Sequence, residues 1–207
     1  MIETPDSLPA RMFLLAYDLR KQRMTTRGSQ LGYVLRAAAL TELYLDGRLS
    51  EERRRPVPGT PGDDPYEMLA QISTSRPRSW QHWIRKDSQA FVATVRAELQ
   101  RDGWIRVTRH RTLGLFPRTQ VTVKDPRVVK ALWGGASSAL RGRPVAHVNS
   151  YDAAAVALAA AGEMASVLPR PDRRRYRRRI AELTARSGPA APAVRKLIGA
   201  ERAAAAG

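Results

Sequence analysis

The chain has 207 residues, of which 43% are hydrophobic, and this is enough apolar material for one substantial core. Lysine and arginine number 36 against 19 aspartate and glutamate residues, so the formal charge is +17 and the expected partners are polyanions: nucleic acid, an anionic membrane or an acidic protein. The sequence contains no cysteine, which excludes disulfide bonds, thiolate catalysis and thiolate-bound metal sites.

Two apolar helices around a basic turn are predicted at the start of the chain. Ser7 can cap the first helix, with Pro9 in its opening turn, and the apolar face continues up to Asp18. The second helix is predicted to begin after residues 25–29 and to end at Gly47, which suits a left-handed cap. Apolar residues at helical spacing predict a buried stripe on this second helix, formed by Leu31, Val34, Leu35, Ala38 and Leu45.

Arg36 lies one residue away from this stripe, where a side chain is expected to bury its stem and expose its charged head. The preceding turn adds four cations, Arg20, Lys21, Arg23 and Arg27, near backbone N–H groups that favour an anion. Each cation also has an ordinary interpretation, because arginines at helix borders often pair with carboxylates, and Lys21 and Arg23 fit solvated loop charges. The excess of positive charge leaves few carboxylates as partners, so the combination favours a phosphate-binding pocket.

The middle of the chain predicts a loop and then three helices. Residues 48–65 are rich in proline, glycine and charge, which indicates a short extended piece and an exposed loop over about 52–65. Helices are expected over 66–73, 79–86 and 88–101, and the last of these has a clear apolar face.

A β-hairpin is predicted next. Residues 104–108 and 113–116 alternate or run apolar between turn signals, and residues 109–111 form a basic turn between them. Apolar segments of this kind usually pack on their own core. The second strand is also a candidate for contact with a bilayer or with another copy of the chain, through Leu113, Leu115 and Phe116.

Helices are predicted for the rest of the chain, over 125–140, over 150–168 and in a basic region over about 171–207. Six arginines fall between Arg173 and Arg179, beside an apolar line of Tyr176, Ile180 and Leu183. This tract fits either a solvated amphipathic helix or a contact with an anionic surface. The expected fold is mostly α, a single-domain helical bundle over residues 1–207 with one β-hairpin.

Several segments of the chain occur in the same order in a known family. The longest runs from Arg11 to Leu49 and contains LLAYDL, a threonine pair and LRAAALTELYLDGRL. The later segments are Gly62-Asp63, the helix over 66–72, His82-Trp83-Ile84, LQRDGWI at 99–105, and Leu113 to Phe116 before Asp125-Pro126. Together they resemble the Golgi phosphoprotein 3 family over most of the chain, less closely after about residue 145. The abundance of arginine and alanine fits a bacterial member with a GC-rich genome.

The resemblance implies a mostly α-helical domain that binds phosphatidylinositol 4-phosphate on membranes. In eukaryotic members it also implies contacts with coat proteins and glycosyltransferase tails. The family's headgroup pocket uses a tryptophan and an arginine from the first helical pair and two basic residues from a later helix. Arg36 falls on the family arginine, Arg27 falls on the tryptophan, and the later pair falls on Gln89 and Val92. Basic residues close enough to substitute for that pair are Arg85, Lys86 and Arg96.

A winged-helix protein that binds nucleic acid is the alternative. The helix over 88–101, Gly103 and a hairpin with Arg109-His110-Arg111 at its tip follow in the order of such a unit. However, that helix needs Phe91 and Val95 for a core, and no polar recognition face precedes it. The preferred interpretation therefore includes no nucleic acid.

Catalysis has less support in the sequence. The three histidines, His82, His110 and His147, are scattered, and no metalloprotease, nucleophile-elbow or phosphate-loop motif occurs. We therefore expect no enzyme activity, no cofactor and no metal.

The overall prediction is a peripheral membrane protein. No window of the sequence approaches the roughly 20 apolar residues of a membrane span, so we expect a cytoplasmic chain at the inner face of a membrane. Its predicted ligands are phosphorylated inositol or other anionic headgroups, bound through Arg36 with help from Arg27 and the basic residues between 85 and 96. Cytosolic tails of membrane proteins are a further expected partner, held by an adaptor function.

Overall fold

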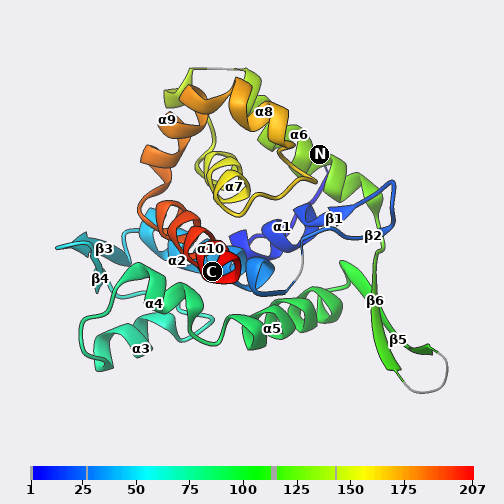
Figure 1. The fold of residues 1–207 in the computed structure, drawn as a ribbon, viewed down its shortest axis with the longest axis horizontal. Coiled ribbons are helices and arrows are strands. Elements are labelled where there is room, and N and C mark those ends of the chain that lie inside the picture. Colours follow the sequence, from blue (N-terminus) through cyan, green and yellow to red (C-terminus); the bar gives the residue numbers. More distant parts are fainter. Residues whose placement is uncertain (1, 27, 113–115, 143) are drawn as a thin grey trace.

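Helices dominate the computed structural model, which describes residues 2–26, 28–112, 116–142 and 144–207, without the side chains of 109–112, 116–118 and 206 (Figure 1). The described part of the chain is 61% helical, with ten helices and three two-stranded antiparallel sheets, which confirms the predicted mostly α single domain. The helices are α1 (Leu8–Leu15), α2 (Gly28–Leu45), α3 (Met68–Thr74), α4 (Trp80–Arg85), α5 (Ser88–Arg101), α6 (Pro126–Arg141), α7 (Ser150–Ala161), α8 (Arg170–Arg175), α9 (Arg177–Ser187) and α10 (Ala190–Ala206). The strands are β1 (Tyr17–Asp18), β2 (Arg23–Met24), β3 (Leu49–Glu52), β4 (Arg55–Pro58), β5 (Ile105–Thr112) and β6 (Phe116–Val123).

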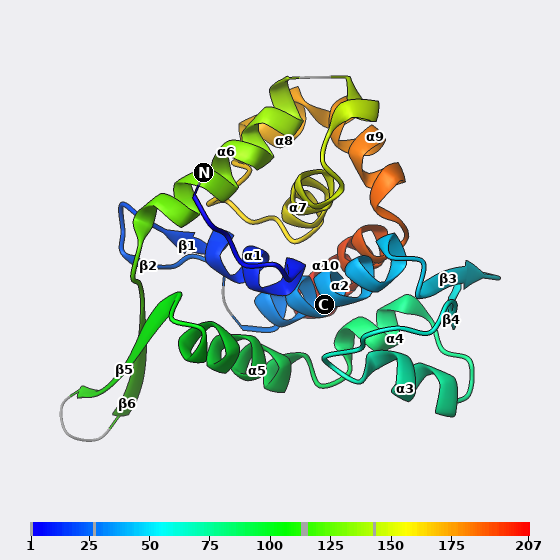
Figure 2. The same cartoon turned by 180° about the vertical axis from the view of Figure 1, so that it is seen from behind.

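Helix α2 lies in the middle of the molecule and is buried on every side. All of its residues from Leu31 to Thr41 are buried, and α1, α4, α5, α7 and α10 pack against it (Figures 1 and 2). The predicted stripe is confirmed, except that Leu45 is only half-buried. A helix that other helices surround has no solvent-facing border. The stripe is therefore only part of the buried surface of α2.

Alanine and glycine let α2 approach its neighbours closely. At Gly32 an added Cβ atom would lie 2.6 Å from the backbone oxygen of Ser88, the first residue of α5. At Gly162, just after α7, an added Cβ atom would lie within 2.2 Å of Val34 Cγ2. Both contacts show that small residues set the spacing between α2, α5 and the end of α7.

The β5–β6 hairpin extends away from the helices (Figures 1 and 2). The prediction of a hairpin is confirmed, but its strand limits were wrong, because residues 109–111 belong to β5 and β6 begins at Phe116. Pairing of Ile105 with Val123 and of Val107 with Val121 aligns one apolar face and fixes the register. Basic residues are tolerated in strands with a solvated face. Leu113 and Leu115 lie outside the described residues, as does the side chain of Phe116, so their membrane contact stays a prediction.

The region predicted as an extended piece and loop forms a second hairpin, β3–β4. Arg53 and Arg54 make its two-residue turn with φ angles of 48° and 62°. Positive φ at both positions matches the twist of paired strands. Because arginine is not a usual residue for such a turn, the sequence carried no signal for it. The short β1–β2 hairpin was likewise not predicted.

Two helix ends also differ from the prediction. Helix α7 ends at Ala161 rather than Leu168, because Glu163 has a φ of 50° and the N–H of Met164 bonds the carbonyl of Ala159. Helix α1 ends at Leu15, where the chain enters β1. Within the described residues, no helix combines the length and hydropathy needed to cross a membrane.

The close approach of α2 and α5 gives a stability prediction. Gly32→Ala should lower the free energy of unfolding by about 1–3 kcal/mol, because the new methyl group would overlap the Ser88 backbone. Gly134→Ala is the matched control, because Gly134 lies within α6 and nothing lies within 4 Å of its added Cβ atom. This substitution should raise the free energy of unfolding by about 0.5–1 kcal/mol. Urea denaturation measures both changes. Equal effects of the two substitutions would contradict the packing described here.

Candidate functional site

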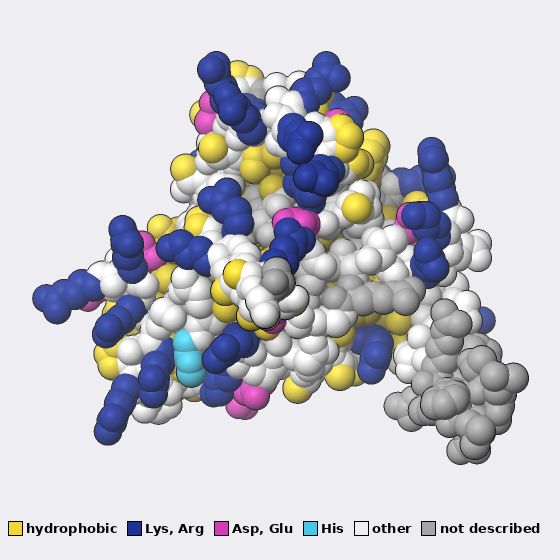
Figure 3. Space-filling view, viewed as in Figure 1, with side chains coloured by type: hydrophobic (Ala, Val, Ile, Leu, Met, Phe, Trp, Pro, Cys, Tyr) yellow, Lys and Arg dark blue, Asp and Glu magenta, His cyan; other side chains and the backbone are white. Residues whose placement is uncertain are grey.

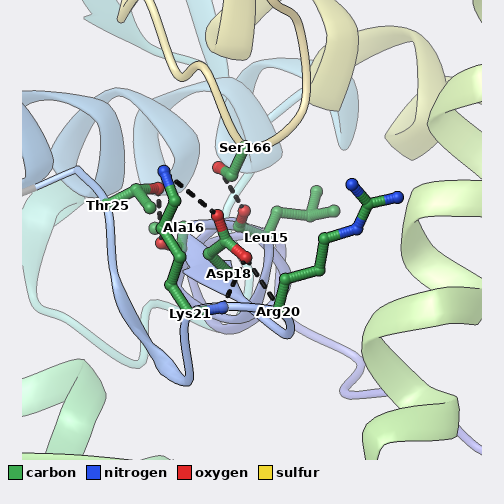
Figure 4. A network of polar contacts seen from close by, with 7 residues as sticks. All are labelled: Leu15, Ala16, Asp18, Arg20, Lys21, Thr25 and Ser166. Carbon is green, nitrogen blue, oxygen red and sulfur yellow. Dashed lines mark hydrogen bonds and ion pairs between the residues drawn. The ribbon is translucent and has the colours of Figure 1, made fainter.

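A network of hydrogen bonds fixes the β1–β2 hairpin at the end of α1 (Figure 4). Asp18 Oδ1 accepts hydrogen bonds from the backbone N–H groups of Arg20, at 2.9 Å, and Lys21, at 3.0 Å. The Lys21 hydrogen bond is the main reason why the pKa of Asp18 lies below its ordinary value. The N–H and hydroxyl groups of Thr25 both bond the carbonyl of Ala16, at 2.9 and 3.1 Å. These hydrogen bonds therefore fix the backbone that carries the basic side chains of the hairpin.

A cavity of about 710 Å³ opens between this hairpin, α1, α2, α5 and β6. Its size falls within the range of roughly 300–1,000 Å³ that is usual for small-molecule sites. Its wall consists of Phe13, Lys21, Gln22, Arg23, Met24, Thr26, Gly28, Leu31, Val92, Arg96, Thr119, Gln120 and Val121. The lining residues of β6 carried no signal in the sequence, because nothing there indicated that the hairpin returns to β2.

Among the described residues of this wall, the charged ones are all cations. Arg23 comes from β2 and Arg96 from α5, and neither side chain forms an ion pair or hydrogen bond with another described residue. Lys21 lies 3.9 Å from Asp18 and its side chain is 60% exposed, so that weak pairing leaves it available to a ligand. Gly28 begins α2, whose first N–H groups add positive potential to the same cavity. The arrangement suits an anion with an apolar portion.

Arg36 is buried and does not line the cavity. Its side chain is 3% exposed, and Nε and Nη2 donate to the carbonyl oxygen of Trp83 at 3.1 and 3.0 Å. The guanidinium carbon also lies 5.4 Å from the centre of the Phe91 ring. Burial lowers the pKa of Arg36, while the negative charge of Asp87 raises it. The prediction that the guanidinium group of Arg36 is exposed was wrong, because α4 and α5 cover this side of α2.

The structure separates the other predicted headgroup residues. Arg96 lines the cavity, one helical turn after Val92. Arg85 and Gln89 are exposed near the junction of α4 and α5, outside the cavity wall. Lys86 Nζ instead bonds Gln71 Oε1 at 2.8 Å and lies 5.3 Å from the centre of the Trp83 ring. Arg27 lies outside the described residues.

Lys21 and Arg23 have a larger role in the structure than the sequence suggested for them. Taken one at a time, both fitted solvated loop charges, yet the hairpin places them on the cavity wall with Arg96. The signal that could have found them is Asp18, because an aspartate two or three residues before exposed backbone N–H groups predicts a fixed turn. Arg20 extends away from Asp18 in Figure 4 and is not part of the wall.

Comparison with known proteins identifies one family. The family model described as Golgi phosphoprotein 3 (GPP34) matches residues 8–200, which is nearly the whole chain. No curated protein sequence matches the chain closely enough to count as a relative.

The burial of Arg36 gives a prediction that distinguishes a structural role of this residue from direct contact with a ligand. Arg36→Lys should lower the free energy of unfolding by about 1–2 kcal/mol, because it loses one hydrogen bond to Trp83 and the stacking on Phe91. Arg178→Lys is the control, because Arg178 is exposed, and its free energy of unfolding should change by no more than about 0.5 kcal/mol. Urea denaturation measures both variants. Unchanged stability together with lost vesicle binding in Arg36→Lys would instead make Arg36 a headgroup contact.

Proposed function

Because the chain belongs to the Golgi phosphoprotein 3 family, we propose that it is a peripheral membrane protein that binds anionic lipid headgroups, phosphorylated inositol among them. The observation that supports this function most is that Lys21, Arg23 and Arg96 line one cavity, whose described wall residues include no carboxylate. We place its site of action at the cytoplasmic face of a membrane. The role is one of binding and includes no catalytic step.

The chemistry of the cavity suits a phosphate monoester. Arginine has a planar fork that donates two hydrogen bonds to phosphate oxygens at once, and Arg23 and Arg96 approach from different elements. Lys21 adds a compact charge near the rim. Phe13, Leu31 and Val92 give the apolar wall against which a sugar ring or a glycerol backbone can pack. Binding of this kind weakens with salt, because the Debye length falls from about 10 Å at 0.1 M to about 3 Å at 1 M.

The residue assignments follow the geometry. Lys21, Arg23 and Arg96 contact the headgroup in this proposal, and Arg36 positions α2 against α4. An adaptor role for cytosolic tails of membrane proteins is compatible with the same fold. The nucleic-acid alternative gains no support, since α5 buries Phe91, Val95 and Leu99 in the core and the matched family is a different one.

Vesicle co-sedimentation tests the proposal. Arg23→Gln/Arg96→Gln should weaken binding to phosphatidylcholine vesicles that contain phosphatidylinositol 4-phosphate by about tenfold or more, because two charge-assisted contacts are lost. The matched control is Arg178→Gln/Arg195→Gln, which removes the same charge from two exposed residues outside the cavity wall. This control should weaken binding less than about twofold to threefold, the part due to general attraction.

Two outcomes would reject the proposed site. Equal losses in the two double variants would show that only the net charge matters. Full binding by Arg23→Gln/Arg96→Gln, with an unchanged thermal unfolding midpoint, would show that the headgroup binds elsewhere. Vesicles with phosphatidylserine at matched charge separate recognition of phosphorylated inositol from recognition of any anionic lipid.

A further inference from the structure

A second basic hollow lies on α8 and the start of α9, apart from the cavity described above. Four arginines line this hollow, which has a volume of about 510 Å³: Arg170, Arg173, Arg174 and Arg177. Their spacing of three, four and seven residues places them on one helical face, and this face persists across the break at Tyr176. Figure 3 shows lysine and arginine side chains gathered over this part of the molecule, at the top of the view.

The nearby carboxylates do not neutralise these arginines. Glu163 lies 3.9 Å from Arg173, but Arg202 already holds it through two hydrogen bonds of 2.6 and 2.5 Å. Asp172, the acidic residue of α8, faces α6 instead and lies 3.6 Å from Arg141. The single negative charge of Glu163 is therefore shared by Arg202, Arg173 and, more weakly, Arg170.

The donor groups of the hollow are largely unused. The side chains of Arg170, Arg174 and Arg177 are exposed and form no hydrogen bond or ion pair with another described residue. Arg173 Nη1 is buried and has no hydrogen-bond partner within the described part of the chain. A buried donor without a partner costs free energy unless a ligand or water satisfies it. Like charges held on one face also repel each other, and a bound anion would relieve that repulsion.

We infer that this arginine hollow is a second anion site, for a ligand that carries at least two phosphate groups. Four guanidinium groups offer more donors than one phosphate accepts, and two linked phosphates match a row of forks along a helix face. A soluble polyphosphate ester and a multiply phosphorylated lipid headgroup share this chemistry. The site goes beyond the proposed lipid cavity and does not depend on it.

Titration calorimetry with inorganic pyrophosphate at 0.15 M salt tests the site. The parent protein for the test is Arg23→Gln/Arg96→Gln, so that the lipid cavity cannot supply the signal. Adding Arg174→Gln/Arg177→Gln should weaken pyrophosphate binding by about tenfold or more. Adding Arg76→Gln/Arg195→Gln, which removes the same charge from two exposed residues outside the hollow, should change it by less than about threefold.

Each outcome of the calorimetry either supports or overturns the arginine hollow as an anion site. Equal losses in the two additions, or no pyrophosphate binding by the parent protein, would overturn the site. Selective loss in Arg174→Gln/Arg177→Gln supports it, and vesicles then identify the source of the phosphate. The same pair, Arg174→Gln/Arg177→Gln, is then made in the wild-type chain and tested on vesicles that contain a bisphosphorylated inositol lipid. Loss of vesicle binding indicates that the ligand is a lipid headgroup, and unchanged vesicle binding indicates a soluble ligand. Failure of the lipid cavity would appear only in Arg23→Gln/Arg96→Gln, so the two proposals fail independently.

Discussion

The burial of α2 on all sides is the constraint on which the rest of the structure depends. Five helices pack around it, and Gly32 lets one of them, α5, approach within backbone contact. Complete burial also forces Arg36 to find a partner inside the protein, and the carbonyl of Trp83 at the end of α4 supplies it. That hydrogen-bonded pair ties α2 to α4 and, through Phe91, to α5. Two of these helices, α2 and α5, also contribute to the wall of the cavity.

A chain with so few carboxylates uses its arginines in an unusual way. Several of them bond backbone carbonyls at the ends of helices and turns rather than acidic side chains. Arg179 Nε donates to Ala139 near the end of α6 at 2.9 Å, Arg186 donates to Val148 at 3.2 Å, and Arg11 donates to Pro5 at 2.6 Å. The carbonyl of Ala139 is among the last ones of α6, which lack intrahelical partners, so the guanidinium group of Arg179 satisfies it directly. Other arginines, such as Arg127 and Arg202, pair with carboxylates, and the arginines outside both roles remain available for anions.

The two basic regions lie on either side of the segment that joins α7 to α8. Ser166 in this segment donates to the carbonyl of Leu15, next to the β1–β2 hairpin, at 2.8 Å. Gln30 on the first turn of α2 donates to the carbonyl of Gly162, and Glu163 follows with its contacts to Arg173 and Arg202. The same short segment therefore contacts the chain beside the β1–β2 hairpin and one edge of the arginine hollow. Side-chain hydrogen bonds to main-chain carbonyls and the ion pairs of Glu163 therefore hold this segment in place.

The sequence by itself determined the helices and the sign of the charge. The spacing of Leu31, Val34 and Leu35 and the cap at Asp125-Pro126 depend on local geometry, and both predictions were confirmed. Only the tertiary structure decided what each cation does. Arg36 is buried because helices distant in the sequence cover its side of α2, whereas Arg23 and Arg96 meet because β2 and α5 line one cavity. Exposure and convergence depend on which elements pack together, and no single segment carries that information.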